Sequence, residues 1–176
     1  MASQTALLGA AGEHFVMSEL LRREYVAALA PAGVPTADIV VTDVEGQRLC
    51  SIQVKTRRDI GSDGGWHMKS KHEGFRGTRL FYCFVDFGKS TEDRPKVFVM
   101  PSTIVAEALQ RSHQKWLATL GAKGQKHKDT VMRRLLPDYT RVFGKSGTNP
   151  YPLGWMEKFR DAWHLLGLQT AKSEAR

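Results

Sequence analysis

The chain has 176 residues, of which 41% are hydrophobic and 25% are charged. This length and composition are typical of a soluble globular protein that can bury a core without disulfide or metal staples, and no apolar run approaches the roughly 20 residues of a membrane helix. The N-terminal segment has no basic start and its apolar run is broken by glycine and by Glu13, so a secretory signal is not indicated. We therefore expect a cytoplasmic protein with no membrane partner.

The chain is basic, with 26 Lys and Arg against 18 Asp and Glu and a formal net charge of +8. Such an excess favours a polyanionic partner. It is concentrated between Arg111 and Lys145, where nine basic residues stand against two aspartates and contribute +7. We expect this segment to contact nucleic-acid phosphates. The alternative is an ordinary solvated loop.

The first predicted element is an amphipathic helix over residues 5–23, with Thr5 as a plausible start. Helical periodicity places Glu13 on the same side as Gly9, Val16 and Leu20, which form a largely apolar stripe. A carboxylate on such a stripe needs a partner. The alternative is that Glu13 lies at the border of the stripe and reaches water.

Strands follow the helix. Residues 24–31 predict a strand that ends at a proline, and residues 37–57 predict a β-hairpin whose turn is Glu45-Gly46. Alternation in the second arm of the hairpin places Ile52 and Val54 on one face and sends Gln53 and Lys55 to the other. Asp38 opens the first arm.

The second half of the chain predicts further strands and then helices. Residues 66–74 favour a short helix or an ordered loop. Later elements are strands over 79–88 and 96–102, a helix over 104–120, a basic loop, and a last amphipathic helix over 154–168. The aromatic residues of that helix, Trp155, Phe159 and Trp163, are expected to pack in the core, with a partner surface as the alternative.

This order of elements predicts an α/β or α+β fold, and the near-continuous apolar strands fit a central sheet that is covered on both faces. We expect one domain over residues 1–176, with a core over about 5–120 and the basic loop and C-terminal helix over about 121–168. Cys50 and Cys83 lie in strand-like apolar contexts without a metal-binding spacing. They are expected to be buried, reduced thiols.

The polar residues of the helix and hairpin form a candidate metal site. Glu13 and Asp38 offer carboxylates and Gln53 offers an amide oxygen, which are the hard ligands that Mg²⁺ or Mn²⁺ prefers. Lys55 beside them could orient a water or stabilise charge on a phosphoryl group, so the expected chemistry is phosphodiester hydrolysis. The alternatives are a turn-capping role for Asp38 and an exposed hairpin face for Gln53 and Lys55.

These residues resemble the motifs of the PD-(D/E)XK nuclease superfamily, which are a helical Glu, a strand-opening Asp, and an acidic residue or Gln two residues before a Lys. Here the matches are Gly12-Glu13, Ala37-Asp38 and Gln53 to Lys55, with 15 residues between Asp38 and Gln53. The resemblance covers residues 5–100. It implies a restriction-endonuclease-like core with a mixed sheet flanked by helices, a divalent metal, and action on DNA or less often RNA. It also makes a homodimer plausible, because cutting both strands of a duplex often needs two sites.

Two positions depart from the superfamily pattern. Ala37 replaces a proline, which affects local geometry, and Gln53 replaces the commoner acid. An amide ligates without adding charge, so metal affinity should fall unless Glu13 or a backbone carbonyl such as that of Val54 compensates. The sequence therefore leaves two hypotheses, an active metal-dependent nuclease or a nuclease-like module that only binds nucleic acid.

Basic side chains outside the motifs are candidates for phosphate contact. The segment from His67 to Glu73 lies close in sequence to the candidate site and could contact phosphate or supply a proton, although a basic surface loop is the alternative. Trp116 and Tyr139 could stack on bases if they are exposed. His113 and His127 lack a second ligand at a zinc-like spacing. The expected phosphate-binding residues are Lys69, Lys71, Lys123, Lys126, Lys128, Arg133 and Arg134.

Overall fold

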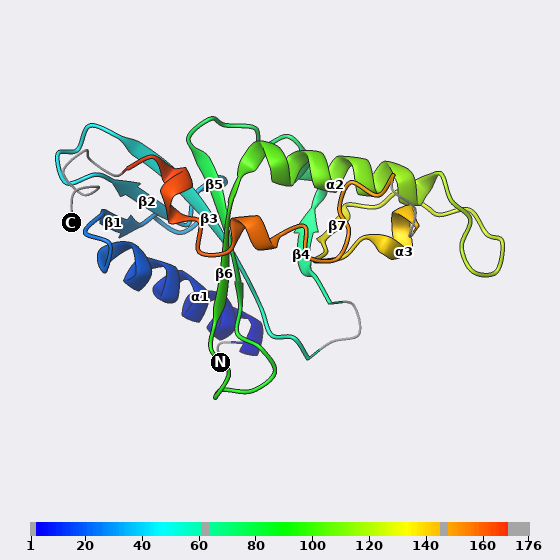
Figure 1. Ribbon diagram of the computed structural model, residues 1–176, viewed down its shortest axis with the longest axis horizontal. Coiled ribbons are helices and arrows are strands. Elements are labelled where there is room, and N and C mark those ends of the chain that lie inside the picture. Colours follow the sequence, from blue (N-terminus) through cyan, green and yellow to red (C-terminus); the bar gives the residue numbers. More distant parts are fainter. Residues whose placement is uncertain (1–2, 61–63, 145–147, 169–176) are drawn as a thin grey trace.

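The structure of the protein is a computed structural model that describes residues 3–60, 64–144 and 148–168 (Figure 1). The elements are α1 (Gln4–Leu21), β1 (Val26–Leu29), β2 (Ile39–Thr42), β3 (Leu49–Arg57), β4 (Trp66–Lys69), the 3₁₀ turn η1 (Ser70–Glu73), β5 (Leu80–Asp86), β6 (Lys96–Pro101), α2 (Ser102–Leu117), β7 (Met132–Leu135), α3 (Thr140–Phe143), η2 (Glu157–Phe159) and η3 (Trp163–Leu166). A five-stranded sheet in the order β1-β2-β3-β5-β6 forms the centre, and β4 and β7 form a separate two-stranded sheet. The central sheet is mixed, because β3 and β5 are parallel while the other neighbouring strands are antiparallel.

The central sheet separates two hydrophobic cores, and the alternation of its strands explains how. On β5, Phe81 and Cys83 face the core under α1, while Tyr82 and Phe84 face the core under α2. Successive strand residues point to opposite faces, so a strand that is apolar at every position can serve both cores. All seven residues of β5 are buried. Figure 1 shows α1 on one side of the sheet and α2, β4 and β7 extending from the other.

Most of the predicted elements are confirmed. The helix over 5–23 is α1, the hairpin over 37–57 is β2 and β3, and Gly46 takes a positive φ of 71° in the turn between them. The strands over 79–88 and 96–102 are β5 and β6. Both cysteines are buried free thiols. No helix within the described ranges is long and apolar enough to span a bilayer.

The segment 66–74 is partly different from the prediction. Residues 66–69 form β4, which pairs with β7, and only residues 70–73 form a helical turn. The burial of β4 alternates, with Trp66 and Met68 inside and His67 and Lys69 outside. This alternation is the signature of a half-buried strand.

The prediction of a last amphipathic helix over 154–168 is wrong. The segment holds two short 3₁₀ turns, separated by Arg160, which bridges to Phe98 of β6, and Asp161, which takes a positive φ of 50°. Phe159 belongs to the core under α2, whereas Trp163 belongs to the core under α1. The chain must cross the edge of β6 between these residues, and a single helix cannot face both cores. The expectation that the aromatic residues pack inside is confirmed for both.

Candidate functional site

The candidate site lies where β3 continues past the end of β2. The last register pair is Ile39 with Ile52, so the following residues of β3 have no β2 partner on that side. Asp38 occupies this point. Its Oδ2 accepts a hydrogen bond of 2.7 Å from the backbone N–H of Val54 and a second hydrogen bond from the side-chain amide of Gln53.

Gln53 and Lys55 share the face of β3 that is opposite to Ile52 and Val54. The register of the parallel pair sets Gln53 beside Tyr82 of β5 and Lys55 beside Phe84. Gln53 is only 5% exposed, so the alternative of an exposed hairpin face does not hold for it. The alternation of polar and apolar residues in the sequence therefore marks a polar patch inside the fold.

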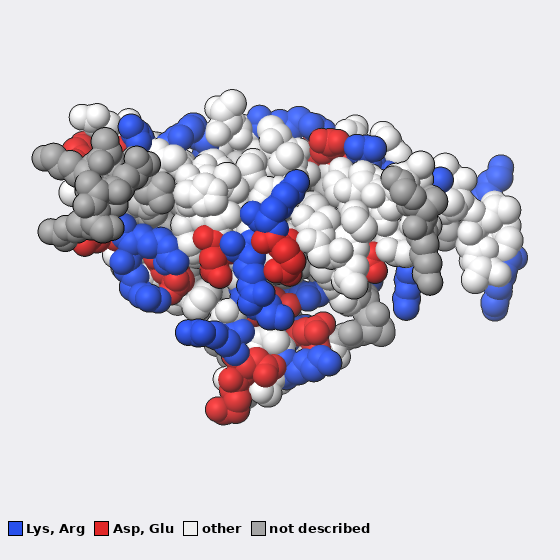
Figure 2. Space-filling view, in the orientation of Figure 1, with Lys and Arg blue, Asp and Glu red and all other residues white. Residues whose placement is uncertain are grey.

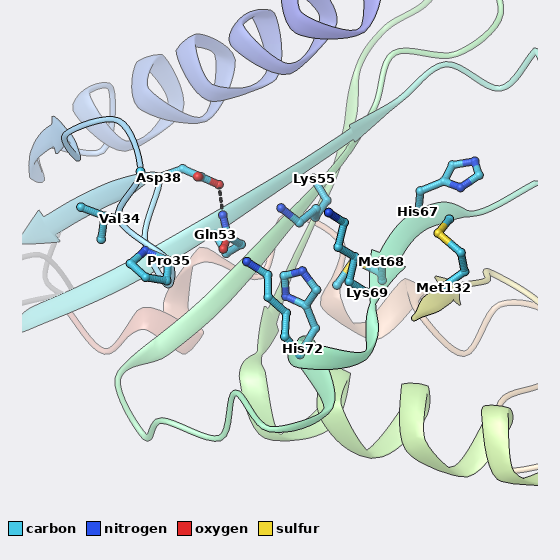
Figure 3. Close-up of a pocket in the computed structure, with 12 residues that line it drawn as sticks. Val34, Pro35, Asp38, Gln53, Lys55, His67, Met68, Lys69, His72 and Met132 are labelled. Carbon is cyan, nitrogen blue, oxygen red and sulfur yellow. Dashed lines mark hydrogen bonds between the residues drawn. The ribbon is translucent and has the colours of Figure 1, made fainter. Parts of the chain in front are cut away.

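Asp38, Gln53 and Lys55 line one pocket of about 450 Å³. Figure 3 shows the hydrogen bond between Asp38 and Gln53 at one side, with Lys55 and Lys69 reaching toward the same space and the His72 imidazole below. Lys71 also lines the pocket, so three lysines surround it. The full lining is Gly33, Val34, Pro35, Asp38, Gln53, Lys55, His67, Met68, Lys69, Lys71, His72 and Met132.

Glu13 approaches this region from the other face of the sheet. It lies on α1 beside Gly12, Val16 and Leu20, which are buried, and is itself half-buried, so it borders the stripe. It does not line the pocket. Burial and the negative charge of Asp38 raise the pKa of Glu13, partly opposed by His14 and Lys55, which places the two carboxylates within electrostatic range of each other.

The positive charges of the pocket act on one another. Burial lowers the pKa of Lys55, and the neighbouring Lys71 adds to this effect, while the carboxylates of Asp38 and Glu13 oppose it. Lys55 therefore interacts electrostatically both with the carboxylates of Asp38 and Glu13 and with the ammonium of Lys71. A phosphate placed in the pocket would meet more positive than negative charge.

The donors of the site meet the requirements of a hard cation in type but offer little charge. Two carboxylates within electrostatic range repel each other, as the raised pKa of Glu13 indicates, and a divalent cation between them would relieve this repulsion. Gln53 would add a neutral oxygen after a rotation of its amide group, which now turns its nitrogen to Asp38. Among residues 3–60, 64–144 and 148–168, no group of three or more His, Cys, Asp or Glu residues is placed to hold a metal ion.

Within the basic segment, residues 120–126 form a short hairpin, which we call the basic hairpin. Leu120 and Lys126 form a β-bridge, and Gly124 turns the chain with a positive φ of 77°. Lys123 and Lys126 on it and Lys128 just after it are exposed, and Figure 2 shows Lys and Arg side chains at the end of the molecule where this hairpin projects in Figure 1.

Several other residues of the basic segment have packing functions. The ring of Trp116 is stacked on His127 with a centroid distance of 4.0 Å and on His113 at 5.5 Å. Tyr139 is buried at 1% exposure, so it does not have the exposure on which base stacking depended. Arg133 also departs from the expectation, because its side chain is 6% exposed and is paired with Glu73. Arg134, its neighbour on β7, is exposed, and Lys145 lies outside the described residues.

Sequence reasoning did not find the residues that complete the pocket walls. Val34 and Pro35 come from the loop before β2, and Met132 comes from β7. The sequence places His72 only within a basic segment, but it is buried and hydrogen-bonded to Tyr82 at 2.8 Å. The alternation of residues 66–69 is a signal that could have shown Met68 to point inward, but it does not extend to His72.

Comparisons with known proteins identify the fold. No protein-family model and no curated protein matches the sequence. Among solved structures, the bacterial homing endonuclease I-Ssp6803I is similar over 99% of both chains, with a TM-score of 0.52 and 16% sequence identity. The Holliday junction resolvase Hjc of the archaeal hyperthermophile Archaeoglobus fulgidus matches over 72% of this chain and 82% of its own, with a TM-score of 0.41 and 16% identity. The restriction-endonuclease-like fold expected from the motifs is therefore confirmed, and the first match extends it through the C-terminal third.

Proposed function

We propose that this protein is a metal-dependent nuclease that hydrolyses phosphodiester bonds of DNA. The observation that carries the proposal is the convergence of Asp38, Gln53 and Lys55 in one pocket, with the Glu13 carboxylate in electrostatic range. The site lies on the fold of a homing endonuclease. Fold alone does not determine activity, so the proposal depends on these side chains.

Asp38, Glu13 and Gln53 would hold Mg²⁺ or Mn²⁺. The bound cation would supply the positive charge that acidifies water and neutralises a scissile phosphate. Asp38 presents its second oxygen, Oδ1, since the hydrogen bonds from Gln53 and Val54 both go to Oδ2. These bonds fix the carboxylate in place before a ligand binds, which lowers the cost of ordering it.

Lys55 would act beside the metal. Its ammonium lies in the pocket with Asp38, and its pKa is lowered by burial, so it can exchange a proton with water more readily than an exposed lysine. Lys69 and Lys71 would hold the flanking backbone phosphates in the same pocket. Lys123, Lys126, Lys128 and Arg134 would extend this contact along the basic hairpin and β7.

Two substitutions test the proposal without removing structural contacts. Asp38→Asn keeps an oxygen that accepts from Val54 but loses the charge, and Lys55→Met keeps the apolar stem but loses the ammonium. With Mg²⁺ or Mn²⁺, the wild-type protein should cleave duplex, branched or single-stranded DNA, and each variant should lose at least 100-fold in rate, on the order of 3 kcal/mol. Circular dichroism and thermal unfolding would show that the variants remain folded.

Unchanged cleavage by either variant would remove that residue from the mechanism. Absence of wild-type cleavage across DNA and RNA of these forms would contradict the nuclease proposal. Contamination is controlled by purifying wild type and Asp38→Asn identically.

A second candidate is a binding module that has lost catalysis. The observation that favours it is the engagement of Asp38 Oδ2 by Gln53 and Val54, which gives this carboxylate a structural purpose of its own. Such a module would bind DNA with a steep salt dependence but would show no Mn²⁺ site by calorimetry. A measurable Mn²⁺ isotherm that is lost in Asp38→Asn would favour the enzyme.

A further inference from the structure

A histidine that lines the pocket is paired with a buried tyrosine, and neither residue has a part in the proposed reaction. His72 Nδ1 and the Tyr82 hydroxyl are 2.8 Å apart, and the two side chains are 4% and 0% exposed. Tyr82 comes from β5, where it is the register partner of Gln53. His72 comes from η1, so two separate elements bring this pair together beside the candidate site.

The Tyr82 hydroxyl determines which imidazole nitrogen carries the proton. A tyrosine hydroxyl carries its proton at neutral pH. Its proton needs an acceptor, because a buried hydroxyl without a partner is destabilising, and the acceptor within the described part of the chain is His72 Nδ1. The remaining ring proton of a neutral imidazole must then lie on Nε2.

The imidazole is neutral at physiological pH. Burial, followed by the positive charges of Lys55, Lys71 and Lys69, lowers the pKa of His72 to about 4. The ring therefore brings no charge into the pocket. It offers one donor with a fixed direction instead.

The Nε2–H of His72 is directed to the pocket. His72 lines the pocket together with Asp38, Gln53 and Lys55, and Figure 3 shows its ring pointing into this space. Within residues 3–60, 64–144 and 148–168, Trp163 Nε1 is the one side-chain nitrogen or oxygen that is buried without a partner. Nε2, for which those residues supply no partner, is therefore in contact with solvent on the pocket side.

We propose that His72 is a phosphate-binding residue, whose Nε2–H donates a hydrogen bond to a non-bridging oxygen of the nucleic-acid backbone, and that Tyr82 is a positioning residue that fixes this tautomer. The inference rests on the proposed function, because it assigns a substrate contact in that site. It adds a directional contact to the three lysines, whose ammonium groups attract phosphate but orient it weakly.

Nitrogen NMR of histidine-labelled protein tests the tautomer without any ligand. At neutral pH the proton of His72 should be found on Nε2, and Tyr82→Phe should shift the ring toward a mixture of tautomers. His14→Gln, which removes an exposed histidine of α1, aids assignment and should leave the His72 signals unchanged. A proton on Nδ1 in the wild-type protein would overturn the inference.

A matched pair of substitutions tests the phosphate contact. In His72→Asn the amide oxygen replaces Nδ1 as the acceptor for Tyr82 but no donor reaches the pocket, whereas in His72→Gln the amide nitrogen replaces Nε2 as the donor. Binding of a fluorescent DNA duplex is measured by anisotropy with Ca²⁺ in place of Mg²⁺. The Asn variant should bind about tenfold more weakly, and the Gln variant within about threefold of wild type.

The outcomes separate this inference from the proposed function. Equal binding by wild type and the Asn variant, or equal losses in the Asn and Gln variants, would overturn the phosphate contact, while DNA cleavage by the wild type would still support the nuclease proposal. No DNA binding by the wild type would overturn both.

Discussion

Gln53 is the residue that sets the charge of the candidate site. In the restriction-endonuclease-like pattern an acid is commoner at this position, and here an amide gives its hydrogen to Asp38 instead. The pair is stable without a cation, because the Gln53 amide is uncharged and donates a hydrogen bond to Asp38, whereas a second carboxylate would repel it. We therefore expect metal affinity in this protein to be lower than in a site with three acids.

Substitution of Gln53 by Glu should raise the metal affinity. An added carboxylate strengthens the attraction for a divalent cation, so the Mn²⁺ dissociation constant measured by calorimetry should fall by about tenfold, or about 1.4 kcal/mol. Without metal the variant should unfold at a lower temperature, since two acids then face each other. Gln53→Met, which removes the ligand oxygen, is the matched control and should weaken Mn²⁺ binding; equal affinity in all three proteins would mean that this position does not hold metal.

His72 predicts a pH dependence of stability. Its pKa of about 4 in the folded state lies below the ordinary value of 6.5, so the unfolded chain takes up a proton first as pH falls. The free energy of unfolding should decrease between about pH 6.5 and pH 4, by less than the roughly 3 kcal/mol that a shift of this size allows, because the pocket lysines are hydrated. Denaturant unfolding of wild type and His72→Gln at several pH values measures it, and parallel curves would contradict the prediction.

The sequence predicted the polar side of the site but not the pair formed by His72 and Tyr82. The alternation of β3 and the place of Asp38 at the start of β2 are local features, and they were enough to group these residues. The contact of His72 with Tyr82 depends on how η1 folds back on β5, which no local pattern encodes. The pairing of Arg133 with Glu73 is not predictable for the same reason, since a basic residue in a basic segment gives no sign of this distant partner.

The packing of α1 against β3 positions Glu13. Gly12 lies against Thr56, and a Cβ on Gly12 would overlap the Thr56 side chain. Gly12→Ala should therefore destabilise the protein by about 2 kcal/mol, since neither strand nor helix can move freely in a packed core. It should also shift Glu13 and weaken Mn²⁺ binding.

Gly9 is the matched control for this substitution. It lies on the same helix, and no atom lies within 4 Å of the Cβ that an alanine would add. Gly9→Ala should leave stability unchanged or raise it by up to about 1 kcal/mol. Thermal unfolding of both variants decides the matter, and similar losses in the two would show that the close approach at Gly12 has no special importance.

Elements with a uniform local pattern are predicted well, whereas the segment 154–168, whose aromatic side chains divide between the two cores, is not. Apart from Asp86 at the end of β5 and Lys96 at the start of β6, both strands are apolar and are flanked by turns, so their existence follows from the sequence alone. The spacing of Trp155, Phe159 and Trp163 fits one helical face equally well. Their side chains nevertheless divide between two cores, and a periodicity shows only that residues are buried, not on which side of a sheet.

At the scale of the whole molecule, the basic hairpin predicts a salt-dependent contact with DNA. Replacing Lys123, Lys126 and Lys128 together by Gln should lower the slope of log affinity against log salt by up to about 3, because each phosphate that a lysine no longer neutralises reduces the slope by about 0.9. Anisotropy titrations over a range of salt concentrations measure this. The control replaces Lys89, Arg94 and Lys96, which are exposed residues around the β5–β6 connection. This connection lies apart from the hairpin in Figure 1. Equal changes of slope in both triple variants would mean that the hairpin attracts DNA only through the net charge of the protein.

The crossing of the β6 edge by residues 156–166 has a consequence for biosynthesis. Met156 and Phe159 complete the core under α2, and Trp163 and Leu166 complete the core under α1. The ribosome adds all four residues after every strand of the central sheet. Neither core can be completed before residues 156–166 have been synthesised. Both apolar faces of the sheet therefore stay open to chaperones, or to other nascent chains, until these residues emerge.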